Sequence, residues 1–161
     1  MKKRLLIAGG AVLALVIIGV SIYFLTKPKP PTDEFRVRSV VYGLGDVIVN
    51  VSLATTTEAI AASMDEYYAL YVRPDLLETW KTNPSKAPTR PVTGPRPDSI
   101  VINTVVKNED GTYTITGDIV IRAVDHASST AAARTPVRFT LSQGPDGWQI
   151  SGYEVVLPSA V

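Results

Sequence analysis

The amino-acid sequence predicts an α+β protein in which an N-terminal transmembrane helix precedes one outer domain of helices and antiparallel strands. Three observations predict this class. Residues 5–25 are almost entirely apolar. Apolar residues recur at helical spacing in residues 55–82, and apolar and polar residues alternate through most of residues 99–156. These patterns divide the chain into a cytoplasmic tail (1–4), a transmembrane helix (5–25), a proline-rich linker (26–33) and an extracytoplasmic domain (34–161).

The apolar run from Leu5 to Leu25 has the length of a membrane-spanning helix. Its 21 residues, rising about 1.5 Å each, span roughly 31 Å, close to the thickness of a hydrocarbon core. A secretory signal has a shorter apolar part and a small-x-small cleavage site, and no such site follows Leu25. We therefore expect an uncleaved single-pass anchor in the cell membrane, with a cleaved export signal as the alternative. The short basic tail is expected to stay in the cytoplasm while the domain is translocated.

Composition argues against several classes of function. The chain has no cysteine, which excludes disulfides, thiol nucleophiles and cysteine-bound metals. Five of the 16 basic residues flank the apolar run, whereas all 15 acidic residues follow it, so the outer domain has a net charge of about −4. An acidic domain without a cluster of Lys and Arg is poorly suited to binding nucleic acid. No phosphate loop, zinc spacing or calcium loop occurs, so we expect no cofactor and no metal.

The beginning of the domain alternates with period two. The stretches "FRVRSVV" and "DVIVNVSL" predict two strands within residues 35–53, joined at "YGLGD". The pattern leaves open how these strands attach to the rest of the sheet.

Two helices are predicted next. In "TTTEAIAASMDEYYALYV", Thr55 and Glu58 form a capping box at the start of a long helix. The residue before Pro74 cannot continue a helix easily, so the long helix is expected to end there. Pro74 is in turn a favourable first residue for a short helix, "PDLLETW". The residues at helical spacing on the long helix are Ile60, Met64, Tyr68 and Tyr71.

The remainder predicts a long connection and four strands. Residues 84–97 contain five prolines and read as an extended loop, a length that is uncommon in compact domains. "SIVINTVV" and "TYTITGDIVIRAV" flank a hairpin turn at "KNEDG", where Gly111 can take positive φ. "TPVRFTLS" and "WQISGYEVV" flank a second turn at "QGPDG". The apolar rows of these strands are Tyr113, Ile115, Gly117, Ile119 and Ile121; Val137, Phe139 and Leu141; and Trp148 and Ile150.

The stretches "YYALYVRPDLLETW" and "RTPVRFTLSQGPDGWQI" resemble the NTF2-like (cystatin-like) superfamily, in which a strongly curved sheet wraps around helices. The first stretch also resembles uncharacterised membrane-anchored bacterial domains with a "YY…V.P.LL..W" pattern. The likeness covers about residues 55–157 and includes no catalytic signature. An anchor followed by such a domain is, more distantly, the layout of VirB8-like subunits of bacterial secretion and conjugation machines. The resemblance therefore implies a place in a cell-envelope assembly.

No catalytic constellation is apparent. The apolar rows that would face the hollow of such a sheet hold no acid or base, and general acid–base catalysis needs one within reach of the substrate. His126 is the single histidine and stands in a loop of small residues. Asp65 and Glu66 are adjacent on a helix, so their carboxylates diverge. Asp118 and Arg122 are expected to form ion pairs with neighbours. We expect that the protein is not an enzyme.

Two functions from different classes remain. In the first, the domain is an interaction or scaffold domain that binds another envelope protein or a second copy of itself, through Tyr67, Arg90, Arg96 and the proline-rich loop. The free edges of the sheet are a second candidate surface. In the alternative, the domain binds a small ligand, or acts as a weakly specified enzyme, in the hollow near Tyr68, Trp80 and Tyr113.

Overall fold

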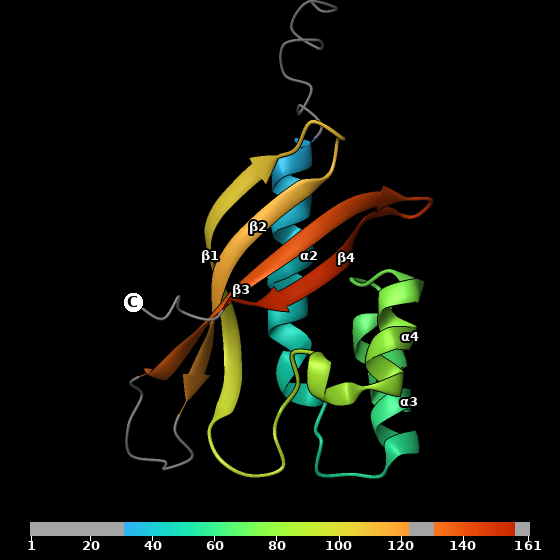
Figure 1. Ribbon diagram of the computed structural model, residues 1–161, viewed down its shortest axis with the longest axis vertical. Coiled ribbons are helices and arrows are strands. Elements are labelled where there is room, and N and C mark those ends of the chain that lie inside the picture. Colours follow the sequence, from blue (N-terminus) through green and yellow to red (C-terminus); the bar gives the residue numbers. More distant parts are fainter. Residues whose placement is uncertain (1–30, 123–130, 157–161) are drawn as a thin grey trace, which may run out of the picture. The chain divides into compact units, whose positions relative to one another are not determined.

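A computed structural model describes residues 31–122 and 131–156, which form an α+β structure (Figure 1). The predicted transmembrane helix at residues 5–25 and His126 lie outside the described residues. Within the described ranges, no helix is both long enough and apolar enough to cross a membrane. The described elements, in chain order, are α2 (Asp33–Val47), η1 (Ile48–Asn50), α3 (Thr57–Tyr68), α4 (Pro74–Thr82), η2 (Pro84–Lys86), β1 (Arg96–Lys107), β2 (Tyr113–Arg122), β3 (Ala131–Gly144) and β4 (Gly147–Val155).

The two strands predicted within residues 35–53 do not form, and that prediction is wrong. This segment is α2 followed by the short 3₁₀-helix η1. Its fully buried residues, Val37, Val41, Leu44 and Ile48, are spaced by four, three and four positions, which places them on one helix face. Thr32 caps the helix, because its hydroxyl accepts a hydrogen bond from the backbone N–H of Phe35 at 3.2 Å.

Two glycines allow α2 to lie close to its neighbours. A Cβ on Gly45 would be 3.0 Å from the backbone nitrogen of Ile100 in β1. A Cβ on Gly43 would be 2.4 Å from the ring of Tyr71. Side chains at these positions would therefore separate α2 from the sheet and from the turn after α3.

The next two helices form close to where they were predicted. The cap of α3 is Thr56, not Thr55 as predicted, since the Thr56 hydroxyl accepts from the N–H of Ala59 at 3.3 Å. The helix ends at Tyr68, earlier than the predicted stop before Pro74. Pro74 is the first residue of α4, which confirms that prediction.

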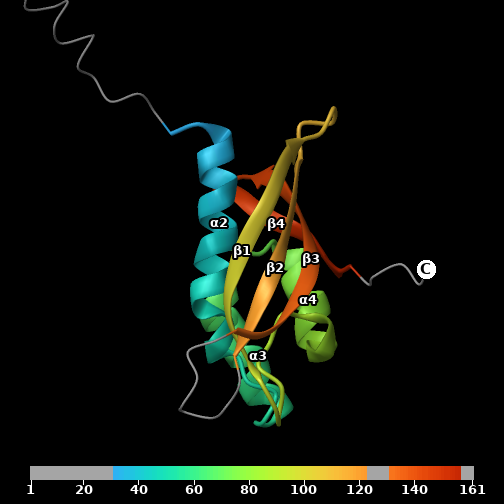
Figure 2. The same cartoon turned by 90° about the vertical axis from the view of Figure 1, so that its left-hand side faces the viewer.

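The four predicted strands form one antiparallel sheet in the order β1-β2-β3-β4. Both predicted hairpin turns are present, and Gly111 and Gly147 take positive φ values of 84° and 121°. Helix α2 lies against one face (Figure 2) and contacts both edge strands, β1 and β4, so the sheet curves around it. The expectation of one long and one short helix is corrected accordingly: the described domain has three α-helices, and α2 is the longest.

The two edges of the sheet differ. Residues Tyr71 to Arg73 run beside the middle of β4 as a short parallel bridge. There, the N–H of Ile150 donates to the carbonyl of Tyr71 at 2.8 Å, and the N–H of Arg73 donates to the carbonyl of Ile150 at 2.9 Å. The edge of β4 is thus occupied at its centre by the chain itself.

The core contains the apolar rows that were predicted. All of Ile115, Phe139, Leu141 and Ile150 are fully buried. Aromatic rings continue the core from helix to sheet, with centroid distances of 5.9 Å between Tyr68 and Trp80, 5.7 Å between Trp80 and Tyr153, and 5.4 Å between Tyr153 and Phe139. Each buried polar side-chain atom of the described residues has a hydrogen-bond partner. The core is filled.

Candidate functional site

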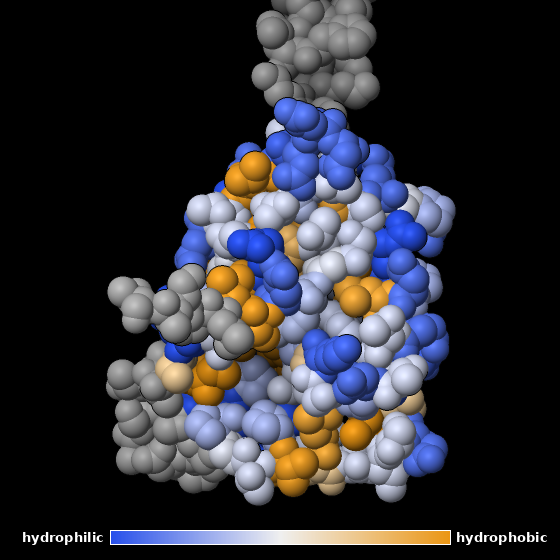
Figure 3. All heavy atoms as spheres, viewed as in Figure 1, coloured by the Kyte–Doolittle hydropathy of each residue, from blue (hydrophilic) through white to orange (hydrophobic). Residues whose placement is uncertain are grey.

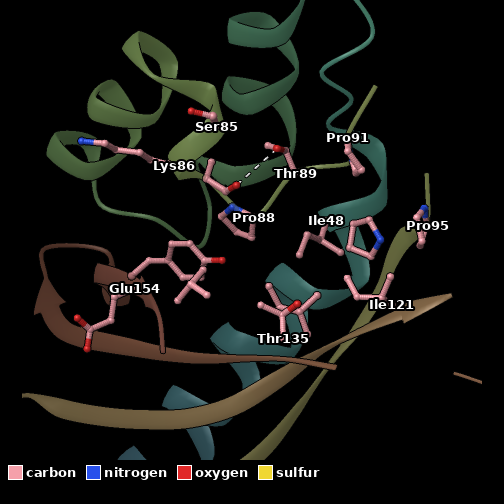
Figure 4. A pocket seen from close by; sticks show the side chains of 15 residues that line it. Ile48, Ser85, Lys86, Pro88, Thr89, Pro91, Pro95, Ile121, Thr135 and Glu154 are labelled. Atoms are coloured by element: carbon pink, nitrogen blue, oxygen red, sulfur yellow. Dashed lines mark hydrogen bonds between the residues drawn. The ribbon is translucent and has the colours of Figure 1, made fainter. Parts of the chain in front are cut away.

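A cavity of about 440 Å³ lies between the proline-rich segment and one end of the sheet (Figure 4). It is bounded by η1 on one side, by the segment from η2 to the start of β1 on another, and by the ends of β2, β3 and β4. We call this hollow the proline cavity. Its lining residues are Ile48, Ser85, Lys86, Ala87, Pro88, Thr89, Pro91, Pro95, Pro97, Ile119, Ile121, Thr135, Tyr153, Glu154 and Val155.

Backbone pairing and one tyrosine fix the proline-rich segment in place. The N–H of Arg90 donates to the carbonyl of Val51 at 2.8 Å, and the N–H of Leu53 donates to the carbonyl of Arg90 at 2.9 Å. The Tyr68 hydroxyl donates to the carbonyl of Pro88 at 2.5 Å. Prolines lack an N–H and cannot extend a ladder. The segment is therefore held at these points, and only its last residues, Arg96 and Pro97, enter the sheet as the start of β1.

The interior of the proline cavity is uncharged. Aliphatic and prolyl side chains supply most of the lining. The two charged residues, Lys86 and Glu154, direct their charged ends away from the hollow in Figure 4, and Glu154 forms an ion pair with Arg138. A hydrophobic area also borders a hollow on this side of the surface (Figure 3). Because charges are costly to bury without partners, this lining favours an uncharged occupant.

The polar groups at the wall are hydroxyls. Ser85, Thr89 and Thr135 contribute aliphatic hydroxyls, and the phenol of Tyr153 belongs to the same lining. Burial raises the pKa of Tyr153 to about 12. Burial also raises the pKa of Tyr68, whose phenol holds Pro88. Both phenols stay neutral near pH 7, where they offer hydrogen bonds and no charge.

The residues predicted for partner binding fall into two groups. Arg90 lies between the lining residues Thr89 and Pro91, and Arg96 lies between Pro95 and Pro97. Tyr67 is half-buried on α3, packs against the core and is not a lining residue. The two arginines are thus next to lining residues in the chain without lining the cavity themselves, and Tyr67 lies on another element.

The residues predicted for the alternative pocket lie in the core. Tyr68 and Trp80 are buried and in contact with each other. Tyr113 packs against Trp148 in a separate aromatic pair, with the two ring centroids 5.1 Å apart. None of the three lines the proline cavity. Tyr68 affects the cavity only through its hydrogen bond to Pro88.

Several lining residues escaped the sequence analysis. Ile119 and Ile121 were assigned to the core row, and Ile48, Thr135 and Tyr153 were not singled out. The available signal was the spacing of the prolines in residues 84–97, which indicates an extended segment with few backbone donors.

The remaining ionisable side chains with shifted pKa values have surface partners. The hydrogen bond from Arg73 lowers the pKa of Asp75, and those from Thr112 lower the pKa of Asp110. Hydrogen bonds to Glu78 and Asp65 raise the pKa of Lys81. Asp118 accepts from Asn103 at 3.0 Å, and Arg122 pairs with Asp98 at 2.9 Å. In the described ranges, no three His, Asp or Glu residues are grouped so that they could hold a metal ion.

Comparison with known proteins identifies no family. No protein-family model matches the chain, and no curated protein matches it. Among solved structures, an NTF2-like designed protein aligns with a TM-score of 0.40 and 12% identity, over 78% of this chain and all of the other. The intermembrane-space region of the chloroplast protein ARC6 aligns with a TM-score of 0.39 and 12% identity, over 81% of this chain and all of the other.

Proposed function

We propose that this protein is a single-pass membrane protein whose outer domain, of NTF2-like fold, is an interaction subunit of a cell-envelope assembly. The proline cavity is its binding site. The order of elements supports the proposed fold, because α2 supplies a helix before the sheet, and the sheet curves around it. The observation that carries the proposed function is that this cavity of about 440 Å³ is lined mainly by aliphatic and prolyl side chains.

The chemistry of the lining supports an apolar, uncharged stretch of a partner protein as the occupant. Aliphatic and prolyl surfaces favour apolar side chains, and the hydroxyls of Thr135 and Tyr153 offer hydrogen bonds to a partner backbone. Arg90 and Arg96 are next to lining residues in the chain and complement acidic residues that flank such a stretch. Arginine is also frequent among residues that dominate binding energy.

The same lining supports binding over catalysis. General acid–base chemistry near neutral pH needs a group that exchanges a proton there. The pKa of Tyr153 is about 12, and the charged ends of Lys86 and Glu154 point away from the hollow. These features favour a domain that holds an occupant without transforming it.

A small apolar molecule is the second candidate occupant. The cavity volume of about 440 Å³ falls within the roughly 300–1,000 Å³ typical of small-ligand sites. This small molecule and the partner segment would contact the same lining. They can be distinguished by whether a protein adduct or a co-purifying compound is found.

Photo-cross-linking in native membranes tests the proposal. A photo-reactive residue replaces Pro95, which is exposed and lines the cavity, and Glu109, in the exposed β1–β2 turn, is the control position. We expect a discrete protein adduct from position 95 and none from position 109. The variant Thr135→Phe, which fills the cavity, should lower the yield at position 95 about tenfold.

The outcomes separate the two occupants. Equal labelling at positions 95 and 109, or a yield at 95 that Thr135→Phe leaves unchanged, would contradict the cavity as the binding site. An apolar compound that co-purifies with the native chain and is lost from Thr135→Phe, without a protein adduct, would favour the small-ligand function. The melting temperature of Thr135→Phe, measured beside the native chain, checks that the variant is folded.

A further inference from the structure

The free edge of β1 differs from the opposite edge of the sheet. Residues Tyr71 to Arg73 pair with the middle of β4, whereas β1 pairs only with β2 among the described residues. β1 is the strand nearest the viewer in Figure 2, with α2 beside it on one face. The outward backbone groups of residues 101–106 therefore have no backbone partner within the described ranges. Such a row is a template for another strand.

The exposed part of this edge lacks the usual protection against pairing. Edge strands are commonly guarded by charges, prolines or very short length. Residues 101–106, "VINTVV", contain neither a charge nor a proline and belong to a strand of 12 residues. Val101 and Val106 are 37% and 53% exposed. An uncharged, β-branched segment is thus presented to solvent along an open edge.

Because of a β-bulge, the order of outward-facing and inward-facing side chains in residues 101–106 is the same in both chain directions. The register shifts between Ile102 and Thr104, so that Val101, Thr104 and Val106 lie opposite the outward residues Asp118, Thr116 and Thr114. Ile102 and Val105 lie opposite Gly117 and the buried Ile115, on the inner face. From either end, the order is therefore an outer valine, an inner aliphatic residue and a polar residue.

The polar side chains at the centre are held over the sheet. The Asn103 amide donates to Asp118 at 3.0 Å, and the hydroxyls of Thr104 and Thr116 are 2.6 Å apart. These bonds direct both side chains toward β2 and away from the free edge. Access to the backbone of β1 is left open.

We propose that β1 pairs in antiparallel fashion with β1 of a second copy of this chain. The twofold axis passes between Asn103 and Thr104, which places Val101 opposite Val106 and Ile102 opposite Val105 of the second copy. Apolar residues then meet on both faces of the joined sheet.

This surface is independent of the proline cavity. None of residues 98–107 lines the cavity, so both can be occupied in the same molecule. Failure of one proposal would leave the other untouched.

Cysteine cross-linking of the full chain in membranes tests the pairing, and the absence of native cysteine removes any background. The double variant Val101→Cys/Val106→Cys should form a covalent dimer under mild oxidation, because directly opposite residues bring their Cβ atoms within reach of a disulfide. Each single variant should give no dimer alone, and the two single variants should cross-link when co-expressed. No dimer from the double variant, or a dimer from either single variant alone, would overturn the proposed register.

A lysine at the centre of the edge supplies the second test. Thr104→Lys, added to the double variant, brings like charges together across the axis and should lower the dimer yield about tenfold or more. Val92→Lys is the matched control, since Val92 is 64% exposed but lies on the proline-rich segment. An unchanged yield with Thr104→Lys, or an equal loss with Val92→Lys, would contradict pairing through β1. Melting temperatures of both variants show that they fold.

Discussion

Two tyrosines connect the aromatic core to the wall of the proline cavity. Tyr68 is fully buried and donates its hydroxyl to the carbonyl of Pro88. Tyr153 packs on Trp80 and Phe139 while its ring also lines the cavity. Removing the Tyr68 hydroxyl would leave a buried carbonyl without its donor, a loss that costs about 1–3 kcal/mol. The Tyr68 hydroxyl thus helps the backbone pairing at Arg90 to hold the proline-rich segment in place.

These tyrosines predict a loss of stability in alkali. A phenol whose folded pKa is raised stabilises the fold fully below the unfolded value of about 10. Above it the unfolded state releases the proton first, and stability is lost as pH rises toward the folded value, which for Tyr153 is about 12. The free energy of unfolding should therefore fall from about pH 10 upward.

The variant Tyr153→Phe measures how much Tyr153 contributes to the loss of unfolding free energy in alkali. It removes a titrating group and keeps the ring stacked, so its stability should decline less steeply than that of the native chain between about pH 10 and 12. Urea unfolding at several pH values measures both slopes. Parallel slopes would show that Tyr153 ionises in the folded protein as readily as in the unfolded chain.

At the scale of elements, two adjacent threonines at the start of α3 have different hydrogen-bond partners. The Thr56 hydroxyl caps the helix, whereas that of Thr55 donates to the carbonyl of Ser52 outside it. Thr56→Ala should destabilise the domain by about 1 kcal/mol through loss of the cap. Thr55→Ala, the matched control, should have a clearly smaller effect. Chemical unfolding of both variants decides between them, and the reverse order would restore the cap predicted from sequence.

The same scale shows which elements a sequence can predict. The hairpins were predicted because each depends on a few neighbouring residues, as at Gly111. Helix α2 was missed because Val47, Val49 and Val51 alternate. Gly43 and Gly45 also weaken a helical reading. Those glycines are explained by packing against Tyr71 and Ile100, contacts that lie far away in the chain. The overlooked local signal was Thr32 followed by two acidic residues, a typical helix start.

For the candidate site, the sequence indicated the proline-rich segment but not the cavity. The spacing of prolines is local, and so is the prediction of an extended loop over residues 84–97. The volume beside it depends on the ends of three strands and on η1, which converge only in the folded domain. Tyr68 and Trp80, which were predicted for the alternative pocket, are buried in the core and do not line the cavity.

At the scale of the whole molecule, the proposed anchor predicts an orientation. In intact cells, a membrane-impermeant maleimide should label Glu109→Cys and should not label Lys2→Cys until the membrane is permeabilised. The cysteine-free chain makes each label specific. Labelling of Lys2→Cys in intact cells would contradict the proposed topology. Loss of the apolar segment from the mature chain, seen by intact-mass measurement, would instead indicate a cleaved export signal.

The bridge at Ile150 has a consequence for how large an assembly can grow. A sheet with two open edges can add subunits at both ends and polymerise, which is the route to fibres. Here residues 71–73 occupy the middle of one edge, and the pairing proposed for β1 uses the other. Once two copies have joined, the edges left among the described strands are the two β4 edges, and each is interrupted at Ile150 by its own chain. A third copy could not pair along the whole of β4 without displacing this bridge, so we expect assembly through sheet edges to favour the dimer over longer polymers.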